Sequence, residues 1–98
     1  MIYVVAELRL MAGRADKAVA EARSVVAGTV KEDGCIFYDM HRSIHDPDKL
    51  VVVERWASRA ALDAHMKTPH LQAWRAAGKE FVTERKVEII TPEKVDTL

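Results

Sequence analysis

Apolar and polar residues alternate along four short segments of the chain, and between these segments the apolar residues recur every three or four positions. Alternation is typical of β-strands and predicts four of them, at residues 2–10, 35–42, 50–57 and 85–91. The longer spacing predicts a helix at 14–32 and a pair of short helices after the third strand. Ser58 is expected to cap the first helix of that pair, and Thr68-Pro69 to begin the second. The predicted order is β, α, β, β, α, β.

This order in a chain of 98 residues predicts an α+β, ferredoxin-like βαββαβ fold, in which a four-stranded antiparallel sheet carries its helical segments on one face. The sequence contains no linker, repeat or low-complexity run. We therefore expect a single domain over 1–98, with its core at about 2–91. Pro92 should end the last strand and leave 92–98 as a C-terminal tail.

The central strands carry apolar residues on both faces. Val51 and Val53 point to the opposite side from Leu50 and Val52. Helices can cover only one of these faces, and an uncovered apolar face promotes association unless another copy of the chain buries it. A chain this short also builds only a thin core of its own. These features predict a homodimer joined through the sheet face.

The charges are balanced, with 15 basic and 15 acidic residues, and no stretch concentrates Lys or Arg. This pattern argues against nucleic acid and membrane surfaces as partners.

The apolar run at 1–6 has no basic leader and is followed by Glu7, so neither a signal peptide nor a membrane span is expected, and the predicted location is the cytoplasm. Cys35 is the only cysteine, which excludes an internal disulfide and favours a small buried side chain.

Reactive side chains are expected to gather on the helix-facing side of the sheet. Glu54 and Trp56 share one face of the third strand, and His65 lies on the apolar face of the next helix. A buried carboxylate is costly unless it is paired, and histidine is the side chain that titrates nearest neutral pH. We therefore expect His65 to act as a base and Glu54 to act with it or orient it. The alternatives are a Glu54 that only pairs with a backbone group or an arginine, and a His65 that is only a core residue.

No metal site or cofactor is predicted. His41 and His45 flank a turn rich in aspartate, but their spacing matches no zinc pattern. The chain also lacks a glycine-rich phosphate loop and a flavin or nicotinamide fingerprint. Any oxidation would have to use a borrowed cofactor or none.

The chain resembles the antibiotic biosynthesis monooxygenase family, which includes small quinol monooxygenases. The resemblance extends from the first strand to about Thr91, and its most specific part runs from Glu54 to His70. It implies a dimeric α+β barrel in which each subunit holds an apolar pocket between sheet and helices. The motifs that carry it are Glu32-Asp33-Gly34-Cys35, Tyr38, Asp46-Pro47, Glu54-Arg55-Trp56, Ala60-Ala61-Leu62-Asp63-Ala64-His65 and Thr68-Pro69-His70.

The resemblance also implies a function. Family members of the monooxygenase type oxidise phenolic or quinol-like aromatics with O₂ and use no metal, flavin or haem, because the deprotonated substrate itself can pass an electron to O₂. The catalytic residues implied by position are His65 as the base, Trp56 as a stacking wall, Tyr38 as a positioning phenol and Glu54 as the orienting group. The implied substrate-binding residues are Leu62, Met66, His70 and Trp74, of which the last two would border the entrance.

Two other functions stay open at this point. A related class of enzymes isomerises small phosphorylated sugars and has a similar His and Thr-Pro-His run, but it needs a phosphate site, for which the candidates are Arg9, Arg42 and Arg75. A non-catalytic protein that binds an aromatic ligand would use the same apolar pocket.

Overall fold

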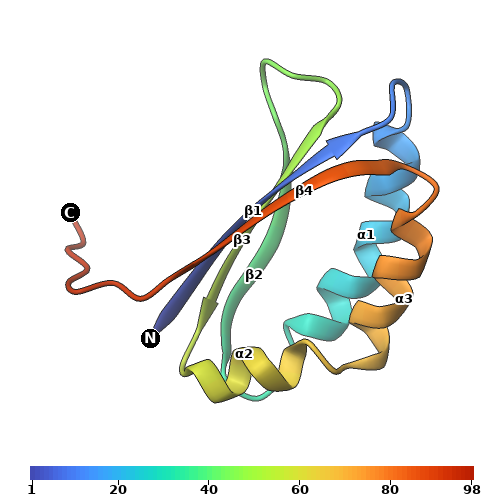
Figure 1. Ribbon diagram of the computed structural model, residues 1–98. Coiled ribbons are helices and arrows are strands. Elements are labelled where there is room, and N and C mark those ends of the chain that lie inside the picture. The colour runs from blue at the N-terminus through green and yellow to red at the C-terminus, as the bar shows by residue number, and fades with distance from the viewer.

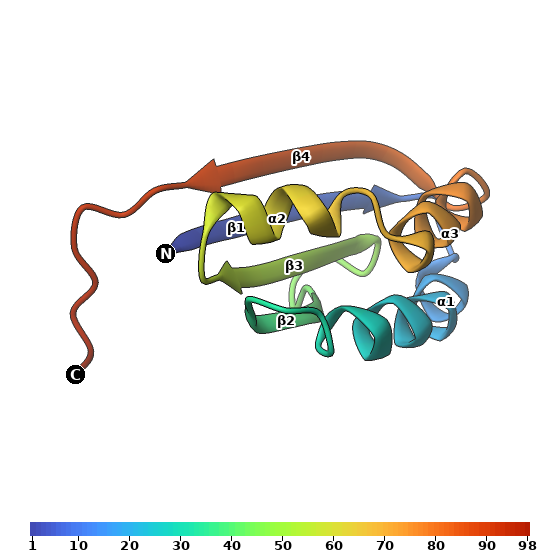
Figure 2. The same ribbon diagram turned by 90° about the horizontal axis from the view of Figure 1, so that it is seen from below.

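The computed structural model describes residues 1–98 and contains one four-stranded antiparallel sheet with three helices on one of its faces (Figures 1 and 2). The strands, in the spatial order β2-β3-β1-β4, are β1 Ile2–Leu10, β2 Cys35–Arg42, β3 Lys49–Trp56 and β4 Val82–Ile90. The helices are α1 Ala15–Thr29, α2 Arg59–His65 and α3 Pro69–Gly78. The predicted ferredoxin-like βαββαβ order is confirmed.

Local side-chain hydrogen bonds begin the two short helices where the sequence predicts. The Ser58 hydroxyl accepts the backbone N–H of Ala61, and the Thr68 hydroxyl accepts that of Leu71, with Pro69 in the first turn. Each hydroxyl thereby satisfies an N–H that has no partner inside the helix. No helix in residues 1–98 combines the length and the apolar composition needed to cross a membrane.

Two elements differ in length from the prediction. The first helix ends at Thr29 rather than continuing to residue 32, because the chain turns there toward Gly34, whose φ is 81°. The last strand begins at Val82, three residues before the predicted start, because its pairing with β1 continues as far as Leu10. The early end of α1 matters for the site, since it leaves Glu32 in a turn.

The core lies between the sheet and the helices. Alternate residues of β1 and β3 are buried on this inner face, including Val4, Val52 and Trp56. On the outer face Val51 and Val53 are only half-buried, and no helix covers them. The middle of β3 therefore carries apolar residues on both faces of the sheet, and the helices cover only the inner face.

The inner face of β4 is left partly open. Val87 and Ile89 pair with Ala6 and Val4, which are buried, yet they remain 54% and 45% exposed. The helices lie over the other strands, and the segment after Ile90 extends away from the sheet (Figures 1 and 2). This opening leads to the space under α2.

Candidate functional site

A cavity of about 250 Å³ lies between the inner face of the sheet and helices α2 and α3. Most of its wall is apolar and comes from β1, β4 and the two helices. The polar groups that reach it are Tyr38, Glu54, His65 and, from α3 and β4, Arg75 and Arg85. A mostly apolar cavity with a few convergent polar groups is typical of a small-molecule site.

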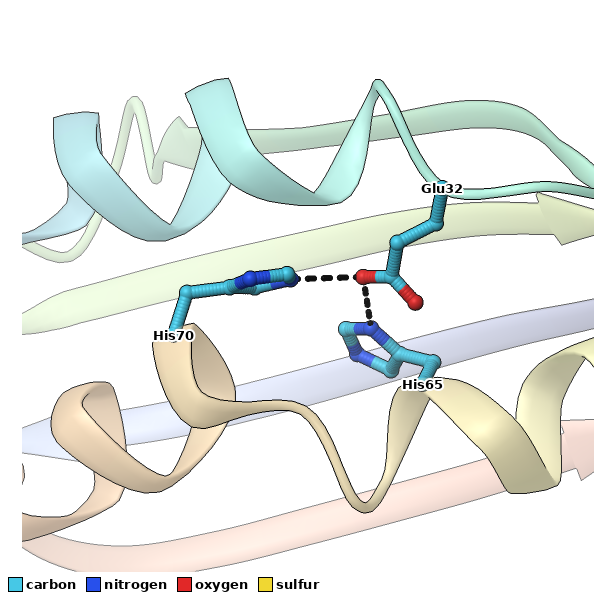
Figure 3. Close-up of side chains that lie close together, drawn as sticks. All are labelled: Glu32, His65 and His70. Carbon is cyan, nitrogen blue, oxygen red and sulfur yellow. Dashed lines mark hydrogen bonds and ion pairs between the residues drawn. The ribbon is translucent and has the colours of Figure 1, made fainter.

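His65, at the end of α2, is the most deeply buried ionisable side chain of this cavity. It is 2% exposed, and its ring lies against Trp56 at a centroid distance of 4.8 Å and Tyr38 at 5.4 Å. The His65 Nδ1 atom is 2.8 Å from the Glu32 carboxylate oxygen Oε2. The same oxygen is 2.6 Å from the His70 Nε2 atom, so one carboxylate binds two imidazoles (Figure 3).

Close backbone packing brings these three residues together. A Cβ atom at Gly28, near the end of α1, would lie 2.9 Å from the His70 ring. A Cβ atom at Gly34 would lie 2.6 Å from that of Ala61 in α2. The two glycines therefore let α2 and α3 approach the turn that carries Glu32.

The hydrogen bonds determine which nitrogen of His65 is available. An ionised carboxylate can only accept hydrogen bonds, so the neutral His65 ring must donate its Nδ1–H to Glu32. Its Nε2 atom then carries a lone pair. Because His65 lines the cavity, Nε2 is the group that can accept a proton from a bound ligand.

Glu54 occupies the expected face of β3 but has a different partner. Its Oε1 atom accepts the indole N–H of Trp56 at 2.9 Å. Burial raises the pKa of Glu54, although this hydrogen bond and the charge that His65 carries when it is protonated act in the opposite direction. The carboxylate that contacts His65 is Glu32, which sequence reasoning did not assign to the site.

Tyr38 presents a neutral phenol to the cavity. Its side chain is buried, and burial together with the nearby charges of Glu54 and Glu32 raises its pKa well above the usual range. The phenol therefore keeps its proton at neutral pH and can donate a hydrogen bond to a ligand oxygen.

The other predicted site residues divide into two groups. Leu62, Met66 and Trp74 line the cavity as expected. Trp56 has no exposed surface and is not part of the cavity wall, so it packs under His65 and no ligand can stack on it. His70 also lies outside the cavity wall and turns toward Glu32.

Burial of Glu54 leads to a prediction about stability. Folding raises its pKa from the ordinary value of 4.5, so its contribution to stability is complete below pH 4.5 and is lost as pH rises through the raised value. Glu54→Gln, which cannot ionise, is expected to be more stable than wild type at neutral pH, by on the order of 1 kcal/mol. Urea unfolding at about pH 7.5 and pH 4 measures this. If Glu54→Gln were more stable than wild type by the same amount at both pH values, the prediction would be wrong.

Comparison with known proteins identifies the family of the chain. A model described as antibiotic biosynthesis monooxygenase matches residues 1–77. The probable quinol monooxygenase YgiN of Escherichia coli (strain K12) is 35% identical over 102 aligned residues, which cover 94% of this chain and 98% of that protein. The structure of Rv0793 from Mycobacterium tuberculosis has a TM-score of 0.88 at 31% identity and covers 98% of both chains. PA3566 from Pseudomonas aeruginosa has a TM-score of 0.87 at 26% identity, over 95% of this chain and 94% of that one. The chain therefore belongs to the antibiotic biosynthesis monooxygenase family.

Proposed function

We propose that the protein is a cofactor-independent monooxygenase that oxidises a small phenolic or quinol-type aromatic with O₂. The observation that carries this proposal is the His65 imidazole, which is held by Glu32 through Nδ1 and lines an apolar cavity. The family of the chain and the name of the Escherichia coli relative support the same reaction class.

The base step follows from the hydrogen bonds of His65. A substrate hydroxyl gives its proton to Nε2, which produces an imidazolium and an electron-rich phenolate. The Glu32 carboxylate, 2.8 Å from Nδ1, stabilises the positive ring as it forms. The neutral Tyr38 phenol can donate a hydrogen bond to the substrate oxygen that becomes negative.

The substrate supplies all four electrons needed for the reaction with O₂. The phenolate passes one electron to O₂, and the resulting radical pair combines to form a C–O bond. Cleavage of the O–O bond then leaves one oxygen atom on the ring and releases the other as water. A hydroquinone is thereby converted with one O₂ into a hydroxyquinone and one water, so no external reductant is required.

The size and walls of the cavity fit such a substrate. A cavity of about 150 Å³ is large enough for benzene, and the cavity here is about 250 Å³. Its apolar walls shield the anion and O₂ from water on the sides formed by the sheet and the helices. A phosphorylated sugar fits less well, because most of the cavity wall is apolar and only Arg75 of the three candidate arginines reaches it, together with Arg85. Arg9 and Arg42 pair with Asp46 and Asp16 instead.

Oxygen uptake is the experiment that tests this function. Purified protein is mixed with a panel of hydroquinones, catechols and simple phenols, with a chelator present and no cofactor added. We expect saturable O₂ consumption above the rate with heat-denatured protein. Uptake at the background rate with every aromatic would contradict the proposal. Turnover of phosphorylated sugars alone would support an isomerase, and binding without turnover would support a carrier.

The proposed active form is a homodimer joined through the outer face of the sheet. That face carries the half-buried Val51 and Val53 and the exposed Phe37, and no part of the same chain covers it. Val53→Asp is expected to convert the dimer into a monomer at micromolar concentration, as measured by size-exclusion chromatography with light scattering, because it places a charge in the buried interface. Ala76→Asp, at an exposed position of α3, is the matched control and should remain dimeric. A wild-type monomer would contradict this arrangement.

A further inference from the structure

Three metal-ligating atoms converge beside the cavity. Glu32 Oε2, His65 Nδ1 and His70 Nε2 all lie within 4.8 Å of one another. They come from the turn after α1, the end of α2 and the start of α3 (Figure 3). We name these three residues the Glu32 triad; residues 1–98 contain no other such group of histidine, cysteine and acidic side chains.

We propose that the Glu32 triad binds one late first-row divalent cation of the Zn²⁺ type, and that the bound metal switches off His65 as a base. The first part concerns binding alone. The second part rests on the function proposed above, because it concerns the regulation of that site.

The donor set suits such a cation. Two imidazoles and one carboxylate favour zinc and its neighbours in the first transition row, whereas Mg²⁺ and Ca²⁺ prefer sites made of oxygen ligands alone. Zinc holds nitrogen and oxygen ligands at about 2.0–2.2 Å, so tetrahedral ligands lie about 3.4 Å apart. The two contacts to Glu32 Oε2 are 2.8 and 2.6 Å, so they need to open by less than about 1 Å. Glu32 can supply this adjustment because it lies in a turn and has a long side chain. The two imidazole nitrogens, up to 4.8 Å apart, must approach each other by up to about 1.4 Å.

The triad is accessible from one side. The side chain of His65 is 3% exposed and that of Glu32 is 13% exposed, whereas that of His70 is 25% exposed. A cation can therefore approach past His70. Three protein ligands leave a coordination position for water, as in zinc sites that are not fully closed.

The proposed switch follows from the chemistry of the imidazole ring. Without metal, His65 carries its proton on Nδ1, where it donates to Glu32, and Nε2 holds the lone pair. A metal on Nδ1 uses the lone pair of that nitrogen, so the ring proton must move to Nε2. A protonated Nε2 cannot accept a proton from the substrate. Occupancy by metal and action as a base therefore exclude each other.

Isothermal titration of chelator-treated protein with ZnCl₂ tests the binding. We expect one Zn²⁺ per chain, no comparable binding of Mg²⁺, and affinity reduced by at least roughly tenfold in His70→Ala and His70→Gln. His41→Ala and His45→Ala are matched controls, because they remove the two histidines outside the triad. His41 lies on the surface, where its Nε2 atom is 4.0 Å from the Asp39 carboxylate oxygen Oδ2. No Zn²⁺ binding, or binding that depends on His41 or His45 and not on His70, would overturn the site. Circular dichroism verifies that each variant is folded.

Nitrogen-15 NMR of the histidine rings tests the switch separately. The proton of His65 is expected on Nδ1 in metal-free protein and on Nε2 after one equivalent of Zn²⁺. Oxygen uptake should fall in proportion to occupancy and return when a chelator is added. A proton that stays on Nδ1, or full activity in Zn²⁺-saturated protein, would overturn the switch. If the protein binds Zn²⁺ but the metal-free protein oxidises no quinol, the proposed function is contradicted and the metal site is still supported.

Discussion

His65→Gln is expected to lower kcat for quinol oxidation by about 10²–10⁴-fold, because it removes the imidazole that we assign as the base in the cavity. Glutamine has a similar length and stays neutral, so the contacts with Trp56 and Tyr38 should be largely kept. KM should change much less than kcat, since the apolar walls of the cavity remain. Initial rates of O₂ uptake over a range of substrate concentrations measure both quantities.

His45→Gln is the matched control for this variant. His45 lies in the exposed β2–β3 turn, is not part of the cavity wall and does not belong to the triad. It should therefore retain the wild-type rate. A His65→Gln protein that is folded and works within about threefold of wild type would show that His65 is not the base.

The second large effect is expected at Glu32. Glu32→Gln removes the negative charge that stabilises the imidazolium, and an amide can donate as well as accept, so it no longer holds the proton of His65 on Nδ1. Replacing the carboxylate that orients a catalytic histidine by an amide can lower kcat by about 10⁴-fold in a serine protease. Here a fall of at least about 10²-fold is expected, measured by the same assay of O₂ uptake.

The effect of Glu32→Gln on kcat should be compared with that of Glu54→Gln. A glutamine at residue 54 can still accept the N–H of Trp56, so the support under His65 should persist. We expect kcat to fall less than about tenfold, well below the effect at Glu32. A larger loss in Glu54→Gln than in Glu32→Gln would restore Glu54 as the partner of the imidazole and contradict the assignment.

The fold could be predicted from the sequence because its signals are local. Alternation along β1 and β3 identifies the buried faces, and the hydroxyls of Ser58 and Thr68 mark the starts of α2 and α3. These patterns extend over a few residues each, so a single sequence displays them. The same alternation correctly placed Glu54 and Trp56 on the inner face.

The partner of His65 could not be predicted in this way. Glu32 is 33 positions from His65 and 38 from His70, and it lies in a turn, where no periodicity indicates the direction of a side chain. Trp56 illustrates a related difficulty. Alternation gives the face on which the indole lies, but only the packing of α2 shows that His65 covers it and separates it from the cavity. Long-range packing thus decides which of the inward-facing groups meets a ligand.

Labelled oxygen offers the most direct measurement of the central claim, that His65 and an apolar cavity allow an aromatic substrate to react with O₂ without a cofactor. Metal-free protein is given a hydroquinone under ¹⁸O₂, and the products are analysed by mass spectrometry. We expect a hydroxyquinone that carries one ¹⁸O atom, with the second atom in water, and loss of this product in His65→Gln. An unlabelled quinone with accumulation of hydrogen peroxide, or no product above background, would contradict the claim.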